Sequence, residues 1–436
     1  MSGELRRSLE RTLKSEILLE RFQRVDEDSL EQLESSGVHL GPEVGRGLAA
    51  VLASSPRAAG FLSTRSRLIG RLAELDRDWL RRRADELEAP GDPTTDLEGF
   101  LDELRLLRRE DTLLAACLDL SGAIPFHEVS AFLSRLADTI VRRAFGAAAS
   151  RASGGDPPEL GVVAMGKLAG SEFTYHSDLD LIFLTPSGSD GIEAASRLAQ
   201  RLVGYLSTMT GAGFAYRVDA RLRPSGHQGM LVTTYEGFRH YQCERAERWE
   251  HLALLRSRAI AGSVSDTQTI LDRTRGEILA RAASSWDYVA DLRRRVHAER
   301  GQESPSRLAF KAGSGGIMDV EFLATGAMLE RGPSLSRVID PSVPGMLRAC
   351  VEGPQVEALL ERYALLRRLE ARVRWVSDRA VEDLDPGSDA FELAAALLDP
   401  DATPSRVLER IAEARHGIAA SAECVARIGS ILALRG

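Results

Sequence analysis

The feature that most constrains the fold is a pair of short apolar runs, LGVVAM and LDLIFL, in a chain whose other segments mostly show helical periodicity. The two runs occupy residues 160–165 and 179–184 and are rich in strand-forming residues. A third strand-like run, GFAYRVDARL, covers residues 213–222. The sequence therefore predicts a small α/β unit inside a mostly helical chain of the α+β class.

Helical patterns lie on both sides of this unit. Apolar residues recur with a period near 3.6 across 96–120, which predicts a helix or helix pair, and across 128–151. A Gly- and Pro-rich segment at 152–158 ends the second pattern. A further helix is predicted around 198–209, and another begins beyond Thr233, whose spacing to Glu236 suits a capping box. We expect a helical region at 1–148, a catalytic domain at 149–265 and a second helical domain at 266–436.

Composition excludes several classes of protein. The 436 residues are 44% hydrophobic, enough for two to four domains with cores. Lys plus Arg is 56 against 64 acidic residues, and the net charge of −8 argues against a nucleic-acid partner. The four cysteines form no C-x-x-C pair, so neither a zinc knuckle nor a disulfide framework is expected. The charged N-terminus and the lack of a long uncharged stretch predict no membrane span and a cytoplasmic location.

Two phosphate-handling patterns compete in GVVAMGKLAGSEFTYHSDLDLIFL, residues 161–184. The first half has the G-x-x-x-x-G-K spacing of a P-loop. A P-loop needs Ser or Thr after its lysine to bind Mg²⁺, and a helix directly after the loop. Leu168 follows Lys167, and the next residues resemble a turn. We therefore reject the P-loop and assign Lys167 at most a contact to phosphate.

The second half carries Asp178 and Asp180, two residues apart on a predicted strand. Both side chains would leave the same face, roughly 6–7 Å apart. Paired carboxylates beside a buried apolar run are costly unless a cation compensates them, and Mg²⁺ prefers such carboxylates together with substrate phosphates. The alternative is that Asp178 is a turn residue and Asp180 a strand-edge charge.

Residues near Asp178 and Asp180 favour a site that binds a metal ion and phosphate. Gly170 and Ser171 offer backbone amides and a hydroxyl to a phosphate, and Asp219 in the third strand-like run completes a possible triad with Asp178 and Asp180. Arg221 and Arg223 follow at alternate positions, so on a strand they would share the face of Asp219 and could bind triphosphate oxygens. A structural ion-pair network between these arginines and the aspartates is the competing interpretation.

Other polar and aromatic residues receive structural interpretations. We expect Trp249 to be a core residue, His251 to be structural, and His176 to be as much a turn residue as part of a site. The glycine-rich segment 311–316 could form a backbone anion nest, but a flexible interdomain turn is preferred.

Four motifs in order resemble the glutamine synthetase adenylyltransferase family. They are AMGKLAGSEFTYHSDLDLIFL, GFAYRVDARLRPSGHQGMLVTTYEGFRHY, RWEHLALLRSRAIAG and KAGSGGIMDVEFL, within a resemblance that covers about residues 95–380. The resemblance implies a DNA-polymerase-β-like nucleotidyltransferase unit flanked by helical bundles. It also implies metal ligation by Asp178, Asp180 and Asp219, with Gly170 and Ser171 as the nucleotide-phosphate turn. Ala169 stands where the family usually has glycine, and Met318 stands where one half of the family commonly has arginine, so we assign Met318 no catalytic role.

The resemblance further implies Mg²⁺-dependent transfer of AMP from ATP to a tyrosine of glutamine synthetase, with a nitrogen-signalling protein as a further partner. Family members typically contain two catalytic halves, one attaching AMP and one removing it by phosphorolysis, whereas this chain resembles one half. RWEHLALLRSR favours attachment, and removal stays open. A nucleotidyltransferase with another target and a catalytically silent helical regulator are the remaining alternatives.

Overall fold

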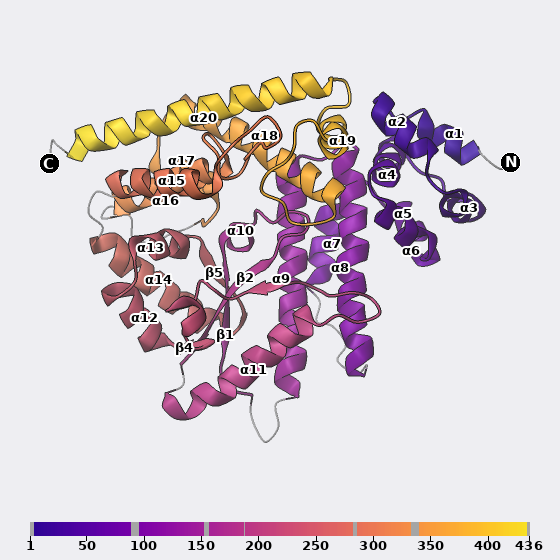
Figure 1. The fold of residues 1–436 in the computed structure, drawn as a ribbon. Coiled ribbons are helices and arrows are strands. Elements are labelled where there is room, and N and C mark those ends of the chain that lie inside the picture. The colour runs from indigo at the N-terminus through magenta and orange to yellow at the C-terminus, as the bar shows by residue number, and fades with distance from the viewer. Residues whose placement is uncertain are drawn as a thin grey trace.

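A computed structural model describes residues 4–88, 96–151, 157–186, 188–281, 286–332 and 340–433. The described chain is mostly helical and contains one small mixed sheet (Figure 1), which confirms the α+β class. Likeness to DNA polymerase β stays a prediction. Among the described residues no helix is both long and apolar enough to cross a bilayer.

The N-terminal part is all helical. Asp96 caps the 24-residue helix α8 by accepting a hydrogen bond from the Gly99 amide at 2.9 Å, so the predicted helix or helix pair is a single helix. Helix α9 packs beside it and ends at Ser150, directly before the predicted Gly- and Pro-rich break, of which 152–156 lie outside the described residues. The helices are α1 (Glu4–Glu10), α2 (Glu16–Gln23), α3 (Glu27–Ser35), α4 (Pro42–Ser54), α5 (Pro56–Ser63), α6 (Ser66–Leu72), α7 (Trp79–Leu87), α8 (Leu97–Leu120) and α9 (Phe126–Ser150).

The sheet has the strand order β3-β2-β1-β5, with β4 also paired to β2. Strand β1 is antiparallel to β2 and β5, whereas β2 is parallel to β3 and β4. The first two predicted strands are confirmed as β1 and β2, and the sequence analysis missed β4 and β5. The strands are β1 (Gly161–Met165), β2 (Leu179–Thr185), β3 (Val218–Asp219), β4 (Val232–Thr234) and β5 (Ser257–Gly262).

The third predicted strand, 213–222, was wrong in extent, because only Val218–Asp219 pairs as β3. The backbone before β3 forms its hydrogen bonds with helices instead. Arg105 of α8 donates to the carbonyl of Gly213 at 2.8 Å, and the amides of Ala215 and Tyr216 both donate to Leu206 at the end of α11 (Ser189–Ser207). Tertiary contacts with helix ends therefore override the local strand preference.

The helical pattern beyond Thr233 consists of two helices, α12 (Tyr235–Glu244) and α13 (Arg248–Leu255). The predicted cap was wrong by one residue, because Thr234 accepts from the Gly237 amide while Thr233 still pairs with β2. Trp249 is 39% exposed, so its prediction as a core residue was wrong. The segment after α13 returns through β5 along the edge of β1.

The C-terminal part is helical again. The longest of its helices, α20, runs across the top of the molecule in Figure 1. The helices are α14 (Val264–Arg281), α15 (Trp286–Arg300), α16 (Ile317–Arg331), α17 (Val343–Cys350), α18 (Pro354–Ser377), α19 (Asp389–Leu398) and α20 (Pro404–Ala433).

The two central strands are buried on both faces. In β2, Leu181 and Phe183 belong to a core shared with the N-terminal helices, whereas Ile182 and Leu184 belong to a core shared with the C-terminal helices. Alternation along a strand directs neighbouring side chains to opposite faces, which explains why the run is apolar at consecutive positions. The sheet thus joins two cores, and the boundaries at 148/149 and 265/266 stay a prediction.

Two helical glycines provide a test of the N-terminal packing. At Gly47 of α4, an added Cβ would lie 1.7 Å from the Cys117 carbonyl oxygen of α8, whereas at Gly60 of α5 nothing lies within 4 Å. We expect Gly47→Ala to destabilise the protein by about 1–3 kcal/mol or more, because two helix backbones must separate. Gly60→Ala should stabilise it by up to about 1 kcal/mol. Urea unfolding of both variants measures the difference, and equal effects would contradict the α4–α8 contact.

Candidate active site

Strand pairing brings two of the three predicted aspartates together. Asp180 of β2 is in register with Asp219 of the parallel strand β3. Asp178 lies one residue before β2, so its predicted position on the strand was wrong, and its side chain is exposed. The carboxylate charges of all three residues act on one another.

Electrostatics make this group unfavourable without a cation. Burial, followed by the charge of Asp219, raises the pKa of Asp180 to about 6, and the ammonium groups of Lys167 and Lys311 partly offset this increase. Partial burial also raises the pKa of Asp178, against the lowering effect of the Arg217 guanidinium. Desolvated like charges raise each other's pKa values in this way, and a bound cation relieves the repulsion.

The donor set fits Mg²⁺, although the carboxylates are not gathered around one point. Within the described part of the chain, no three Asp, Glu, His or Cys side chains are close enough to hold a metal ion as they stand. Asp219 is engaged by Arg221, whose amide and Nε both donate to its Oδ1 at 2.9 Å. The Arg221 side chain is 65% exposed, so releasing this surface pair costs little. Three carboxylates are then available as the oxygen ligands that Mg²⁺ prefers.

The two predicted phosphate-binding arginines differ in position. Both lie in the turns after β3, so the expectation that they share a strand face with Asp219 was wrong. Arg221 forms the ion pair with Asp219, as the competing interpretation proposed. Arg223 donates to the carbonyl oxygens of Ala220 at 2.7 Å and Gly229 at 3.1 Å, which holds the turn together.

The predicted phosphate turn lies at the far end of helix α10 (Gly166–Ala169). An added Cβ at Gly170 would lie 3.1 Å from the Ser342 Cα, and Ser171 is exposed with a φ of 55°. The glycine near the carboxylates is Gly166, where a Cβ would lie 3.5 Å from Asp180 Oδ2. Its φ of +57° favours glycine at this strand-to-helix junction, a signal that the sequence analysis missed.

Lys167 does not occupy a P-loop position. Strand β1 is followed by a helix of four residues, and the Lys167 ammonium binds the carboxylate of Glu370 on α18. Burial lowers the pKa of Lys167 to about 7, and Glu370 opposes that shift. Glu370 also accepts from Arg367 at 2.7 Å and pairs with Arg374 at 3.0 Å. This single carboxylate is therefore shared by three cationic side chains, Lys167, Arg367 and Arg374.

A second buried carboxylate extends this network. Glu172 accepts from Arg256 at 2.6 Å and from the Tyr363 hydroxyl at 2.9 Å. Arg256 also donates to Glu321 of α16 at 2.8 Å. Glu172, Arg256 and Glu321 come from three motifs singled out in the sequence, which thus meet in space. Sequence analysis missed their roles and that of Glu370, because their spacing along the chain carries no signal of contact.

The glycine-rich segment 311–316 is a packed turn rather than a flexible linker. The Gly315 amide donates to Asp319 Oδ2 at 2.8 Å, and Arg415 of α20 donates to the Ser314 carbonyl at 2.8 Å. Asp319 also accepts from Arg293 at 2.8 Å, so the amide already has an anionic partner within the chain.

The two histidines singled out in the sequence, His176 and His251, differ in their surroundings. His251 Nε2 lies 2.8 Å from the Gln242 carbonyl oxygen, which agrees with its predicted structural role. His176 lies 3.5 Å from Asp378, and burial lowers its pKa to about 4. His176 is therefore neutral at physiological pH.

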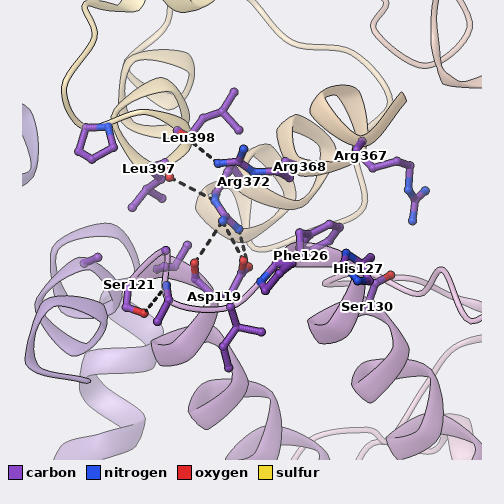
Figure 2. Close-up of a pocket in the computed structure, with 18 of the residues that line it drawn as sticks. Asp119, Ser121, Phe126, His127, Ser130, Arg367, Arg368, Arg372, Leu397 and Leu398 are labelled. Atoms are coloured by element: carbon purple, nitrogen blue, oxygen red, sulfur yellow. Dashed lines mark hydrogen bonds and ion pairs between the residues drawn. The ribbon is translucent and has the colours of Figure 1, made fainter. Parts of the chain in front are cut away.

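A cavity of about 780 Å³ lies between the α8–α9 turn and helices α18 and α19. Figure 2 shows Arg372 pointing toward Asp119, which it contacts at 2.8 Å, while Arg368 donates to the Leu398 carbonyl at 3.0 Å. The Tyr175 hydroxyl also donates to Asp119 at 2.7 Å. This buried ion pair connects α8 with α18.

Comparison with known proteins supports the resemblance. The sequence model of glutamate-ammonia ligase adenylyltransferase matches residues 46–273, about half of the chain, including β1 to β5. A bifunctional glutamine synthetase adenylyltransferase/adenylyl-removing enzyme from Thioalkalivibrio sulfidiphilus (strain HL-EbGR7) is 34% identical over 276 residues. The match covers 58% of this chain and 28% of that relative.

The network behind the aspartates provides a stability test. Glu370→Gln leaves Lys167, Arg367 and Arg374 without their shared anion, so we expect a loss of about 3–5 kcal/mol in unfolding free energy. Lys167→Met should cost much less, because Glu370 keeps two arginines. Glu357→Gln on the same helix is the matched control, since Glu357 pairs with Arg348 at the surface. Urea unfolding checks the order, and a Lys167→Met variant as unstable as Glu370→Gln would contradict it.

Proposed function

Because the chain belongs to the glutamate-ammonia ligase adenylyltransferase family, we propose that it transfers AMP from ATP to a tyrosine of glutamine synthetase. The observation that carries the proposal is the in-register pair of Asp180 and Asp219, with Asp178 beside it. The same segment matches the family model. The chain spans under a third of the curated relative it matches, so activity, substrate and partners are proposals.

We propose that Asp178, Asp180 and Asp219 hold Mg²⁺ with the phosphates of ATP. The metal, when bound, neutralises charge on the phosphates and acidifies the acceptor hydroxyl. The tyrosine oxygen forms a bond to the α-phosphorus, the bond to the β-phosphate oxygen breaks, and pyrophosphate leaves. Asp219, freed from Arg221, accepts the tyrosine proton.

The other residues of the predicted site have supporting roles in this proposal. An added Cβ at Gly166 would lie 3.5 Å from Asp180 Oδ2, so we place a nucleotide phosphate beside Gly166 rather than at Gly170 and Ser171. Arg221 binds phosphate only after leaving Asp219, and Lys167 acts mainly through its pairing with Glu370. Arg223 supports the turn that carries Arg221.

We propose attachment rather than removal as the dominant direction. One set of carboxylates and one pocket catalyse whichever reaction their substrates allow, and separate control of two directions needs separable sites, so we expect one dominant activity. The resemblance of RWEHLALLRSR, residues 248–258, to the attaching half favours attachment. Phosphorolytic removal, another protein or small-molecule target, and a silent regulator stay as alternatives. A cytoplasmic location stays a prediction from the sequence, and a nitrogen-signalling partner follows from the family alone.

The first functional prediction concerns the carboxylates. Asp180→Asn should reduce AMP transfer by roughly a hundredfold or more, because a buried group that organises transition-state charge is lost. Unfolding free energy should not fall, since the neutral amide removes repulsion with Asp219. Asp266→Asn, at an exposed position on α14, is the matched control. Transfer is measured with labelled ATP, and full activity of Asp180→Asn would exclude the assigned site.

The second functional prediction concerns direction. With ATP, Mg²⁺ and unmodified glutamine synthetase, we expect pyrophosphate release to match AMP incorporation into the synthetase. The reverse assay supplies adenylylated synthetase and orthophosphate and measures ADP. Rapid ADP formation without incorporation would reverse the direction while keeping the site. If a folded, Mg²⁺-supplied protein responds in neither assay, glutamine synthetase is not the target.

A further inference from the structure

A second cavity, of about 570 Å³, opens beside Asp178. Its walls come from α5, α8, the segment between α11 and β3, and the end of α18. The carbonyl of Arg217 accepts a hydrogen bond from the Leu179 amide at 2.9 Å, which ties this wall to the start of β2. The cavity therefore adjoins the candidate active site.

The lining of this cavity is strongly cationic. Asp378 is paired with Arg57, and Asp178 is the other acidic group on the walls. The lining arginines are Arg57, Arg108, Arg109, Arg217 and Arg379.

Among the described residues, Arg57 is the one arginine of this lining that forms an ion pair with a carboxylate. Arg108 donates to the Ala215 carbonyl and lies 5.3 Å from the Phe214 ring centroid. Arg109 lies 4.0 Å from the Phe61 ring centroid and donates to the Ala212 carbonyl at 3.3 Å. Burial lowers the pKa of both guanidinium groups, and for Arg109 the charges of neighbouring arginines add to this. Partly desolvated cations held in this way are stabilised by an anion that enters the cavity.

The cavity of Figure 2 is larger and also contains arginines, but most of its arginines have partners within the chain. Arg372 is neutralised by Asp119, and Arg367 by Glu370. Arg368 donates to a backbone carbonyl. Because the arginines of this cavity already have partners within the chain, an anion that entered it would be stabilised less.

We propose that the cavity beside Asp178 binds a phosphate oxyanion, contacted by Arg108, Arg109 and Arg217. This inference rests on the proposed function, because it assigns the phosphate to the reaction at Asp178. The phosphate arrives either as the polyphosphate end of ATP or as free orthophosphate, which share the tetrahedral oxyanion that guanidinium groups bind. Two of the three arginines come from α8, so the N-terminal helices contribute directly to substrate binding.

The test measures binding of inorganic pyrophosphate and of orthophosphate to the full chain by titration calorimetry in metal-free buffer. We expect binding of at least one, and Arg217→Gln and Arg109→Gln should each weaken it by roughly tenfold, the loss of one charge-assisted contact. Arg197→Gln, on the exposed face of α11, should bind as the unchanged protein does. Tighter pyrophosphate binding identifies the polyphosphate end as the occupant, and tighter orthophosphate binding identifies the free ion.

Several outcomes would overturn the inference. The first is that neither anion binds, and the second is that all variants bind with equal affinity. The third is that a hexaglutamate peptide, a carboxylate competitor, binds more tightly and displaces pyrophosphate. Arg217 is exposed, so Arg217→Gln keeps the test valid if Arg109→Gln does not fold. Pyrophosphate binding retained by Asp180→Asn, together with absent AMP transfer in the unchanged protein, would reject the proposed function while keeping the pocket.

Discussion

Burial of β2 on both faces is the constraint on which the rest of the structure depends. A strand that packs against helices on each side places polar groups most readily at its ends, and Asp178 and Asp180 stand at the start of β2. The parallel strand β3 pairs there for two residues, long enough to bring Asp219 opposite Asp180. The carboxylates are thus concentrated by the packing of the sheet.

Concentrated carboxylates require compensating charge, and helix α18 organises much of it. Glu370 and Arg374 of this helix face the aspartate end of β2, where Arg374 also reaches Ser177 at 3.3 Å. Arg372, which lies between these two residues in the sequence, binds Asp119 of α8. A buried ion pair is costly to form and costly to break, so its main effect is to fix where partners lie. Helix α18 thereby fixes the N-terminal helices and the strands of the candidate site in one arrangement.

The sequence predicted the parts of this site that depend on local pattern. Strands β1 and β2, helix α9 and the D-x-D spacing of Asp178 and Asp180 follow from periodicity and residue type. Glu370 could not be found in this way, because its partner Lys167 lies 203 residues away. The failed third strand has the same cause, since Arg105 and other tertiary donors satisfy backbone groups that a strand would have paired. Gly166 could have been singled out, because a glycine directly after a predicted strand often marks a backbone conformation that other residues avoid, and its φ here is +57°.

Helix α8 joins the strands of the candidate site to the N-terminal helices. Arg105, Arg108 and Arg109 stand at positions i, i+3 and i+4, so their side chains leave one face of the helix. All three donate to carbonyls of the segment that leads into β3. The backbone that carries Asp219 is therefore held by α8, which also supplies charge to the cavity beside Asp178. The cavity beside Asp178 is thus lined by side chains from both sides of the predicted boundary at 148/149.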